Sequence, residues 1–286
     1  MALTELQLHG TAALLLQAAD GARAVVTLHG GHVVSWLPAG GHGEQLYLSP
    51  RSGFAPGQAI RGGVPVVFPQ FSDRGPLPRH GFARNRAWQL LRAGDDADGA
   101  ATVVLGLSDD AATRAIWPYA FALELRLRLH GLQLELDLVC ANPGPAPLQF
   151  AAALHTYLRV SDSAQVSIAG LAGCPYHDAV DGQDKTQQED RLSIAGEVDR
   201  VYAAVKGATT VSVQSESDAR RLQVEHTGFA DIVVWNPGPL RCARLADMPA
   251  DGYRTMVCIE SARIAQPVVL ASAQSWSGLQ RLRLLA

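Results

Sequence analysis

The sequence has 286 residues, of which 48% are hydrophobic and 18% are charged, and its formal net charge is −3. A chain of this length can form one large all-β domain or two smaller ones, and its composition is that of a globular protein. The slightly acidic balance lacks the basic footprint that nucleic-acid binding requires. We therefore expect a small-molecule partner and no nucleic acid.

The N-terminus and the cysteines predict a reducing compartment. The first residues, Met1–Glu5, do not form a basic region followed by an apolar core, so no secretory signal is visible. No apolar run approaches the ~20 residues that span a bilayer. The four cysteines are scattered without a Cys-x-x-Cys pair, a spacing that indicates neither a zinc site nor a disulfide framework. We expect a cytoplasmic protein that is not bound to a membrane.

Short strands separated by glycine-rich turns are predicted for the first fifty residues. Arg23–Leu28 and His32–Leu37 flank a Gly30-Gly31 break, which suits a tight β connection. Three histidines lie in or near these segments: His29, His32 and His42. They lack an ordered pattern of cysteine or carboxylate partners, so a metal site is the weaker hypothesis.

An irregular stretch from Ile60 to Trp88 follows, in which repeated glycines and prolines exclude a regular helix. Long segments of this kind are usually functional, and we interpret this one as a rigid surface loop. Its guanidinium groups offer planar donor forks suited to a phosphate or a carboxylate. They belong to Arg61, Arg79, Arg84 and Arg86. From composition alone, a solvated basic loop and an anion site are equally good interpretations.

The clearest structural pattern in the chain runs from Phe121 to Val139. Leucines at every second position from Leu123 to Leu129 alternate with charged residues, and the alternation resumes from Leu132 to Leu138. The pattern predicts a β-hairpin, with a two-residue connection at His130-Gly131 where glycine permits φ > 0.

The expected register of this hairpin pairs Leu127 with Leu134 and Arg126 with Glu135, and it sets Glu124 unfavourably opposite Asp137. All the leucines then share one buried face, whereas a slip of one residue would expose them to water. We interpret the hairpin as core architecture and expect no chemistry from it.

Further strands are predicted along the rest of the chain. They are Thr102–Leu105, Leu148–Val160, Val166–Ile168, Thr210–Val213, Arg221–Glu225, Asp231–Trp235, Met256–Glu260 and Trp276–Leu285. No helix of three turns is predicted, and no dinucleotide-binding, Walker or nucleophile-elbow signature is present. Many short strands with frequent turns indicate an all-β fold, a large antiparallel β-sandwich.

Seven segments carry a resemblance to a known family. They are Ile60–Pro65, Phe68-Pro69, His80–Arg84, Leu154–Tyr157, Asp199–Tyr202, Val234–Pro237 and Met256–Glu260. In this order they resemble the hexose-6-phosphate mutarotases, a branch of the aldose 1-epimerase family, and they extend over most of the chain.

The resemblance implies a single domain over residues 1–286, folded as a galactose mutarotase-like β-sandwich with the sugar in a cleft on its concave sheet. It implies a glucose-6-phosphate 1-epimerase, an isomerase that interconverts the α and β anomers of hexose 6-phosphates. No cofactor and no metal are implied, and we expect a monomer.

Interconverting anomers requires opening the sugar ring, which needs one base and one acid with pKa values tuned toward neutrality. Glu260 ends the apolar run Met256–Ile259, a context that desolvates a carboxylate and raises its pKa, although a solvated strand end is the alternative. His155 lies in a partly apolar strand, where a packed core histidine is the alternative. The resemblance assigns Glu260 as the base and His155 as the acid.

The resemblance also implies four substrate-binding residues. Asp199 matches the acid that accepts hydrogen bonds from sugar hydroxyls, and His80 helps to hold the sugar. Arg61 and Arg84 match the anion-binding arginines. Arg79 departs from the family pattern, since relatives carry a smaller or amide residue there. Its role and that of Arg86 stay open.

Two other functions remain open at this point. One is an aldose 1-epimerase acting on free hexoses, and the other is a non-catalytic carbohydrate-binding β-sandwich. The presence of both Glu260 and His155 argues against the second, because binding alone needs neither group in a tuned state. Trp36 and Trp235 could stack on the sugar, but core packing is the favoured interpretation for both.

Overall fold

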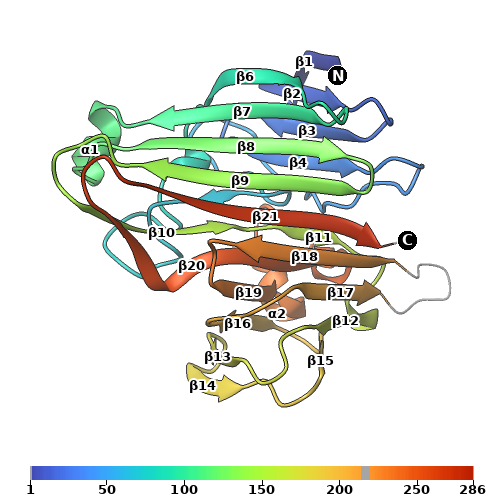
Figure 1. Cartoon of the computed structure of the whole chain (residues 1–286). Coiled ribbons are helices and arrows are strands. Elements are labelled where there is room, and N and C mark those ends of the chain that lie inside the picture. Colours follow the sequence, from blue (N-terminus) through green and yellow to red (C-terminus); the bar gives the residue numbers. More distant parts are fainter. Residues whose placement is uncertain (1, 214–219, 286) are drawn as a thin grey trace.

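The computed structural model describes residues 2–213 and 220–285, which form three antiparallel β-sheets with short helices between the strands (Figure 1). The helices are α1 (Ala111–Ile116) and α2 (Gly238–Cys242), with 3₁₀ turns at Ala83–Asn85, Ser163–Gln165 and Gly252–Thr255. None of the helices in these ranges is long and apolar enough to cross a membrane. The prediction of an all-β antiparallel fold is confirmed.

The largest sheet has nine strands in the described part of the chain and runs across the front of the molecule in Figure 1. Its order is β15 (Arg191–Ser193), β12 (Val166–Ala169), β17 (Thr209–Val213), β18 (Arg221–Thr227), β21 (Ser275–Leu285), β9 (Gln133–Ala141), β8 (Ala122–His130), β7 (Ala101–Ser108) and β6 (Gln89–Asp95). We call it the front sheet.

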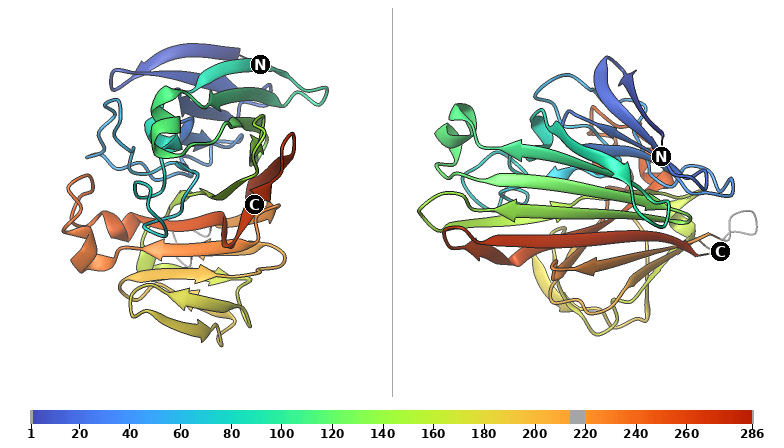
Figure 2. Two further views of the ribbon diagram at one scale, coloured as in Figure 1. Left: turned by 90° about the vertical axis from the view of Figure 1, so that its left-hand side faces the viewer. Right: turned by 45° about the horizontal axis from the view of Figure 1, so that its top comes forward.

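A second sheet of eight described strands packs behind it and is called the rear sheet. Its order is β14 (Gln183–Thr186), β13 (Pro175–Asp178), β16 (Val198–Tyr202), β19 (Asp231–Asn236), β20 (Met256–Leu270), β10 (Leu148–Leu154) and β5 (Val66–Val67), and β11 (Tyr157–Arg159) also pairs with β20. A four-stranded sheet lies behind the β6–β7 end of the front sheet (Figures 1 and 2). It contains β1 (Ala2–Leu8), β2 (Thr11–Gln17), β3 (Arg23–Thr27) and β4 (His32–Leu37).

The leucine-rich hairpin forms as β8 and β9, but its predicted register is wrong by two residues. Leu127 faces Leu136 and Arg126 faces Asp137, and the connection is Gly131-Leu132, with Gly131 at φ +57°. A shift of two residues keeps every leucine of the two strands on the buried face, which is why the alternation could not distinguish the two registers. The observed register avoids the unfavourable pair, because Glu124 lies opposite Val139.

One continuous hydrophobic core lies between the sheets, and we call it the main core. It includes Leu127 and Leu136 of the front sheet, Val234 and Ile259 of the rear sheet, and Trp36 of the four-stranded sheet. A core shared by all three sheets supports a single domain, although the domain assignment itself stays a prediction. For Trp36, which is fully buried here, the interpretation as a packing residue is confirmed.

The irregular stretch after Ile60 is more buried than expected. Residues 62–71 are buried, and β5 forms an edge of the rear sheet. Most of the exposed residues of this stretch lie between positions 73 and 79. The prediction of a surface loop is therefore wrong for most of its length. Glycine explains how the chain passes here, because a Cβ at Gly63 would lie 2.2 Å from the Val33 oxygen and one at Gly81 would lie 2.0 Å from the Phe68 oxygen.

Candidate active site

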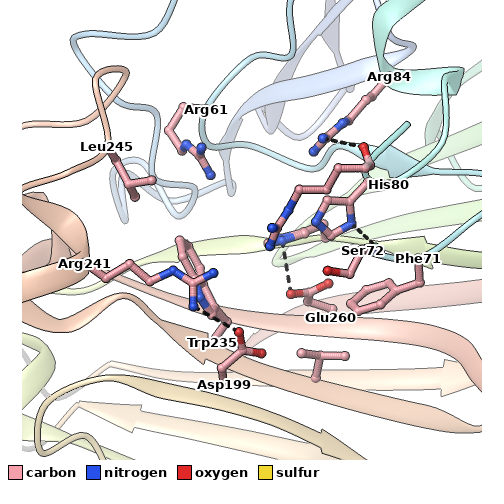
Figure 3. Close-up of a pocket in the computed structure, with 13 residues that line it drawn as sticks. Arg61, Phe71, Ser72, His80, Arg84, Asp199, Trp235, Arg241, Leu245 and Glu260 are labelled. Atoms are coloured by element: carbon pink, nitrogen blue, oxygen red, sulfur yellow. Dashed lines mark hydrogen bonds and ion pairs between the residues drawn. The ribbon is translucent and has the colours of Figure 1, made fainter. Parts of the chain in front are cut away.

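A cavity of about 310 Å³ lies on the face of the rear sheet that is turned away from the main core (Figure 3). Alternation along β19 shows the two faces, because Ile232 and Val234 enter the main core while Val233 and Trp235 line the cavity. The volume lies within the range of small-ligand sites. All six residues that the sequence predicted for the site line this cavity: Arg61, His80, Arg84, His155, Asp199 and Glu260.

His155 and Glu260 meet at the floor of the cavity. The predicted strand Leu148–Val160 is interrupted, so that His155 lies in the gap between β10 and β11, and Glu260 projects from the neighbouring strand β20. His155 Nε2 lies 3.2 Å from Glu260 Oε1, and the two side chains are 9% and 1% exposed. His155 Nδ1 and Glu260 Oε2 are buried without a hydrogen-bond partner among the described residues. The two side chains line the cavity, and these two atoms keep hydrogen-bonding capacity that no described residue uses.

Burial moves both groups toward their neutral forms. It raises the pKa of Glu260 well above its usual range, and the nearby Asp199 carboxylate acts in the same direction. It lowers the pKa of His155 well below its usual range, and the guanidinium groups of Arg84 and Arg61 lower it further. A carboxylate and an imidazole tuned in opposite directions are the pattern expected of an acid–base pair.

Arg61 enters the cavity as half of a fixed ion pair. Its Nη2 lies 3.0 Å from Asp247 Oδ2, its Nε donates to the same oxygen at 3.1 Å, and its Nη1 donates to the Tyr157 hydroxyl at 3.0 Å. The guanidinium plane is therefore held before any ligand arrives. The charge of Arg61 is also largely compensated by Asp247.

Arg84 differs from Arg61, because it forms no ion pair within the described residues. Its Nη2 donates to the backbone carbonyl of Arg79 at 3.0 Å, and its Nε is buried without a partner. Burial lowers the pKa of Arg84 to about 10, so the group stays charged at neutral pH. A partly buried cation without a carboxylate partner is costly unless an anion completes the site.

Arg79 and Arg86, whose roles the sequence left open, lie in different places. Arg79 lines the cavity mouth and pairs with Asp73 at 2.9 Å, with side-chain exposures of 51% and 67%. Arg86 is partly buried and is not one of the residues that line the cavity. Only Arg79 is positioned to act on a ligand.

His80 is oriented by the backbone of its own loop. The Ser72 N–H donates to His80 Nδ1 at 3.3 Å, which leaves Nε2 to carry the proton of the neutral ring. Burial strongly lowers the pKa of His80, and the neighbouring His155 and arginines lower it further. His80 is thus a neutral hydrogen-bond donor, and its ring meets His155 edge-on at a centroid distance of 5.5 Å.

Asp199 of β16 is paired with an arginine that sequence reasoning missed. Arg241 of α2 places Nη1 2.6 Å from Glu197 Oε1 and 3.3 Å from Asp199 Oδ2. Burial raises the pKa of Asp199, and Arg241 opposes this shift. The only signal in the sequence that could have pointed to Arg241 is its position six residues after Trp235, which belongs to a segment matched to the family.

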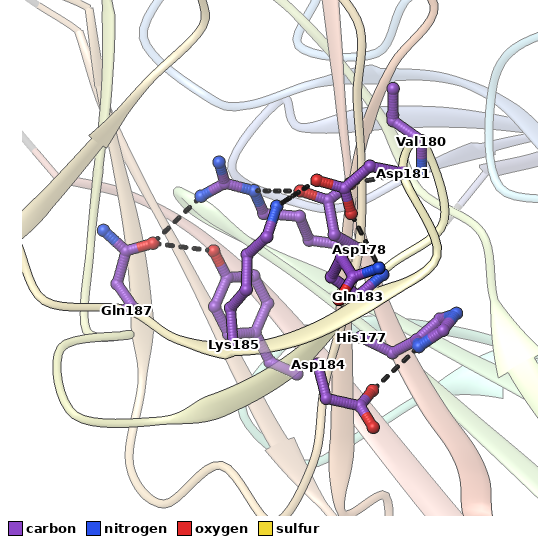
Figure 4. A network of polar contacts seen from close by, with 10 residues as sticks. His177, Asp178, Val180, Asp181, Gln183, Asp184, Lys185 and Gln187 are labelled. Carbon is purple, nitrogen blue, oxygen red and sulfur yellow. Dashed lines mark hydrogen bonds and ion pairs between the residues drawn. The ribbon is translucent and has the colours of Figure 1, made fainter.

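A polar network behind β16 fixes the strand that carries Asp199 (Figure 4). Gln187 Oε1 accepts hydrogen bonds from Arg200 Nη1 at 3.1 Å and from the Tyr202 hydroxyl at 3.0 Å. Lys185 bridges Asp178 and Asp181 in the adjacent hairpin. Every acid in this cluster has a basic partner, so we assign it a structural role.

Trp235 lies both in a packed cluster and at the cavity, the two environments that the sequence allowed. It belongs to a small buried cluster with Tyr157 and Cys258, and one side of it also lines the cavity. The favoured interpretation as a packing residue is therefore incomplete, because the ring is available to a ligand as well.

The histidines near the N-terminus support the loop above the cavity. His29 Nε2 lies 2.6 Å from the Gln58 oxygen, and His32 Nε2 lies 2.7 Å from the Gly62 oxygen. Within residues 2–213 and 220–285, no group of three or more His, Cys, Asp or Glu side chains is arranged to hold a metal ion.

Comparisons with known proteins show which family this chain resembles. Residues 12–283 match the family described as aldose 1-epimerase. A protein of Escherichia coli (strain K12) named "Putative glucose-6-phosphate 1-epimerase" is 38% identical over 243 residues, which are 84% of this chain and 79% of the relative. A protein of the same name from Cenchrus ciliaris is 32% identical over 279 residues, 94% of this chain and 83% of the relative.

The fold has a close counterpart among solved structures. A crystal structure from Salmonella typhimurium, named as that of a "putative mutarotase", superimposes with a TM-score of 0.89 at 30% identity and covers 99% of this chain and 93% of the other. The family match covers strands of all three sheets and every residue that lines the cavity. The chain therefore belongs to the aldose 1-epimerase family.

Proposed function

We propose that this chain interconverts the α and β anomers of a hexose 6-phosphate, with Glu260 as the base and His155 as the acid. Membership of the aldose 1-epimerase family makes the protein an isomerase acting on a sugar. Two relatives carry glucose-6-phosphate 1-epimerase in their names, and the charges in the cavity give a physical reason for the phosphate.

Ring opening needs two proton transfers at neighbouring oxygens of the sugar. In the proposed reaction the proton of the neutral Glu260 carboxyl first passes to His155 across their contact, which forms the reactive carboxylate and imidazolium. The Glu260 carboxylate then removes the proton of the C1 hydroxyl, while the His155 imidazolium donates a proton to the ring oxygen. The C1–O5 bond breaks as the C1 carbonyl forms. After rotation about C1–C2, the C5 hydroxyl attacks the other face of the carbonyl, and both protons return. Two groups 3.2 Å apart are close enough to bracket adjacent oxygens of the sugar.

The observation that carries the phosphate assignment is the unpaired charge of Arg84. A neutral hexose would leave this partly buried cation uncompensated, whereas a phosphate at C6 would neutralise it through charge-assisted hydrogen bonds. Such a bond is worth roughly 1.5–3 kcal/mol, or about 10-fold to 100-fold in affinity. Arg61 is held beside it by Asp247 and adds a second planar donor fork.

The experiment that tests the proposal measures anomer exchange directly. Magnetisation exchange between the two C1 signals of glucose 6-phosphate is recorded by NMR with and without the protein, and the same measurement is made on glucose. We expect kcat/KM to be at least ~10-fold higher for the phosphorylated sugar. Equal values would reject the phosphate and leave an aldose 1-epimerase for free hexoses.

We also propose that the enzyme works as a monomer in the cytoplasm. The residues proposed for both proton transfers and for phosphate binding all come from one chain. All four cysteines are free thiols, which suits a reducing compartment.

A further inference from the structure

The imidazole of His155 lacks the device that usually orients a catalytic histidine. Such a ring is commonly fixed by a hydrogen bond from its second nitrogen to a carboxylate or a carbonyl. Here Nε2 faces Glu260, and Nδ1 is buried without a partner among the described residues. Something other than a hydrogen bond must hold the ring plane.

Aromatic packing supplies that orientation, and Tyr157 makes the most extensive contact. The Tyr157 ring lies parallel to the imidazole, with a centroid distance of 4.9 Å and an interplanar angle of 11°. His80 and Trp235 meet the same imidazole only edge-on, at 5.5 and 6.0 Å. The face of the imidazole, and therefore the direction of Nε2, follows the plane of Tyr157.

The opposite end of Tyr157 reaches the anion-binding part of the cavity. Its hydroxyl accepts the hydrogen bond from Arg61 Nη1 at 3.0 Å, which completes the clamp that Asp247 begins on the other edge of the guanidinium. Tyr157 is itself only 2% exposed, in β11, and register with Cys258 of β20 fixes its backbone. One rigid side chain thus touches both halves of the site.

We propose that Tyr157 is a positioning residue with two separable roles: its ring orients the imidazole of His155, and its hydroxyl orients the guanidinium of Arg61. The inference rests on the roles proposed above for these two residues. Because the ring and the hydroxyl contact different partners, substitutions can remove one role and keep the other.

The hydroxyl is tested by Tyr157→Phe, which keeps the ring. KM for glucose 6-phosphate should rise about threefold to tenfold, because Arg61 loses one of its anchors, while kcat stays within twofold. Turnover of free glucose should not change, since it makes no use of the arginine. An unchanged KM for glucose 6-phosphate, or an equal loss with glucose, overturns the role of the hydroxyl.

The ring is tested by Tyr157→Leu and by Tyr157→Met, whose flexible side chain fills the buried volume if leucine prevents folding. The kcat should fall at least ~10-fold with either sugar, because a misplaced proton donor acts poorly. Phenylalanine should restore kcat. A folded ring-free variant with wild-type kcat, or a Tyr157→Phe enzyme with the same kcat loss as the ring-free variants, overturns the role of the ring.

A matched control is available at Tyr47, which lies in the same buried cluster and stacks on Tyr157 at 6.5 Å but does not line the cavity. Tyr47→Phe and Tyr47→Leu should keep the KM and the kcat of the wild type, even if Tm falls. Each variant is compared with the wild type on the sugar that the wild type turns over. A wild type without preference for the phosphate would therefore refute the proposed substrate and still leave the role of the ring testable.

Discussion

The β8–β9 hairpin and the cavity wall on β19–β20 are built from the same kind of strand but use their two faces differently. In the hairpin, leucines enter the main core and charged side chains face water, where Arg126 pairs with Glu124 and Asp137. Strand β19 is buried along its whole length on both faces, as is the first part of β20. The side of these strands that faces away from the core carries Glu260 and Trp235 instead of solvated charges.

This difference shows where chemistry arises in such a fold. A charged side chain on the outer face of the hairpin is solvated, so water stabilises its charge. Glu260 sits on a face that the loop at residues 61–84 and the segment around α2 cover, so water no longer stabilises its charge. The strands are equally regular in the hairpin and in the cavity wall. The segments that cover the cavity wall desolvate Glu260, and this makes its carboxylate a candidate base.

The largest expected effect comes from removing the buried carboxylate. Glu260→Gln should lower kcat for anomer exchange by ~10²-fold or more, because a positioned base is lost, and His155→Gln should do the same for the acid.

The same substitution should also change stability. The folded state holds a neutral Glu260 carboxyl over a range of pH where the unfolded state ionises, so stability due to Glu260 falls as pH rises through that window. Glutamine removes this penalty, and the variant should be at least as stable as the wild type at pH 8.

The control for this prediction is a glutamate of the hairpin. Glu135 of β9 accepts a hydrogen bond from Arg281 at 2.9 Å and lies on the outer face of the front sheet. Glu135→Gln should exchange anomers at a rate within twofold of the wild type. Wild-type exchange in Glu260→Gln would show that the base has been assigned to the wrong residue.

A substitution in the hairpin should lower the stability of the protein and leave its activity unchanged. Leu127 is 1% exposed, and Leu127→Ala should lower the free energy of unfolding by about 2–5 kcal/mol through the lost burial and the cavity left behind. Urea unfolding at pH 7 measures this loss. Below the transition, kcat per folded molecule should be unchanged, and a matching fall in kcat would mean that the two regions are coupled.

The same two regions show what the sequence could predict. Alternation of leucine and charge identified the hairpin and its buried face, because a period of two directly records which side is covered. It could not select the register, because a shift of two residues leaves both faces intact. The turn decided it, and Gly131 followed by Leu132 has no strong preference in the sequence.

A third prediction compares the cavity arginine Arg84 with an arginine nearby. Arg84→Gln should reduce kcat/KM for glucose 6-phosphate by about 10-fold to 100-fold, mainly through KM, and should affect glucose little. Arg86→Gln, two residues away and outside the cavity, serves as the control. A wild-type KM in the Arg84 variant would remove the main support for a phosphate site.

The site was only partly predictable for a different reason. The apolar run before Glu260 indicated its burial correctly, since that signal is local. The approach of His155 to Glu260, and the pairing of Asp199 with Arg241, depend on which strands become neighbours in the rear sheet. No local pattern reports such contacts. Motifs matched to a family were the only guide to His155 with Glu260, and no motif indicated the pairing of Asp199 with Arg241.

A fourth prediction concerns acid sensitivity, which should come from the cavity side of the molecule. Burial lowers the pKa of His32, which supports Gly62 beneath the loop, to about 3. The unfolded chain binds a proton near pH 6.5, so the unfolded state holds more protons below that pH and stability falls as pH falls. At pH 5 the penalty is about 2 kcal/mol.

Urea unfolding at pH 7 and at pH 5 tests this assignment. The wild type should lose stability over this interval, and His32→Gln, which removes one buried imidazole, should lose about 2 kcal/mol less. His80 and His155, whose pKa values are also lowered by burial, account for further acid sensitivity. An identical loss in wild type and variant would mean that His32 does not titrate on unfolding.

The smallest effects are expected from two exposed arginines, one in each region. Arg79 at the cavity mouth and Arg126 on the hairpin are both about half exposed and both pair with carboxylates, so alanine at either position should cost less than about 1 kcal/mol of stability. Their effects on catalysis should differ, because only Arg79 adds positive potential where a phosphate would enter. Arg79→Ala should raise KM for glucose 6-phosphate about twofold to threefold at low ionic strength, and the difference from wild type should fade near 0.5 M salt as the charge is screened. Arg126→Ala should leave KM unchanged at every salt concentration. If the two variants behave alike, the potential at the cavity mouth plays no part in binding, and recognition depends on Arg61 and Arg84 alone.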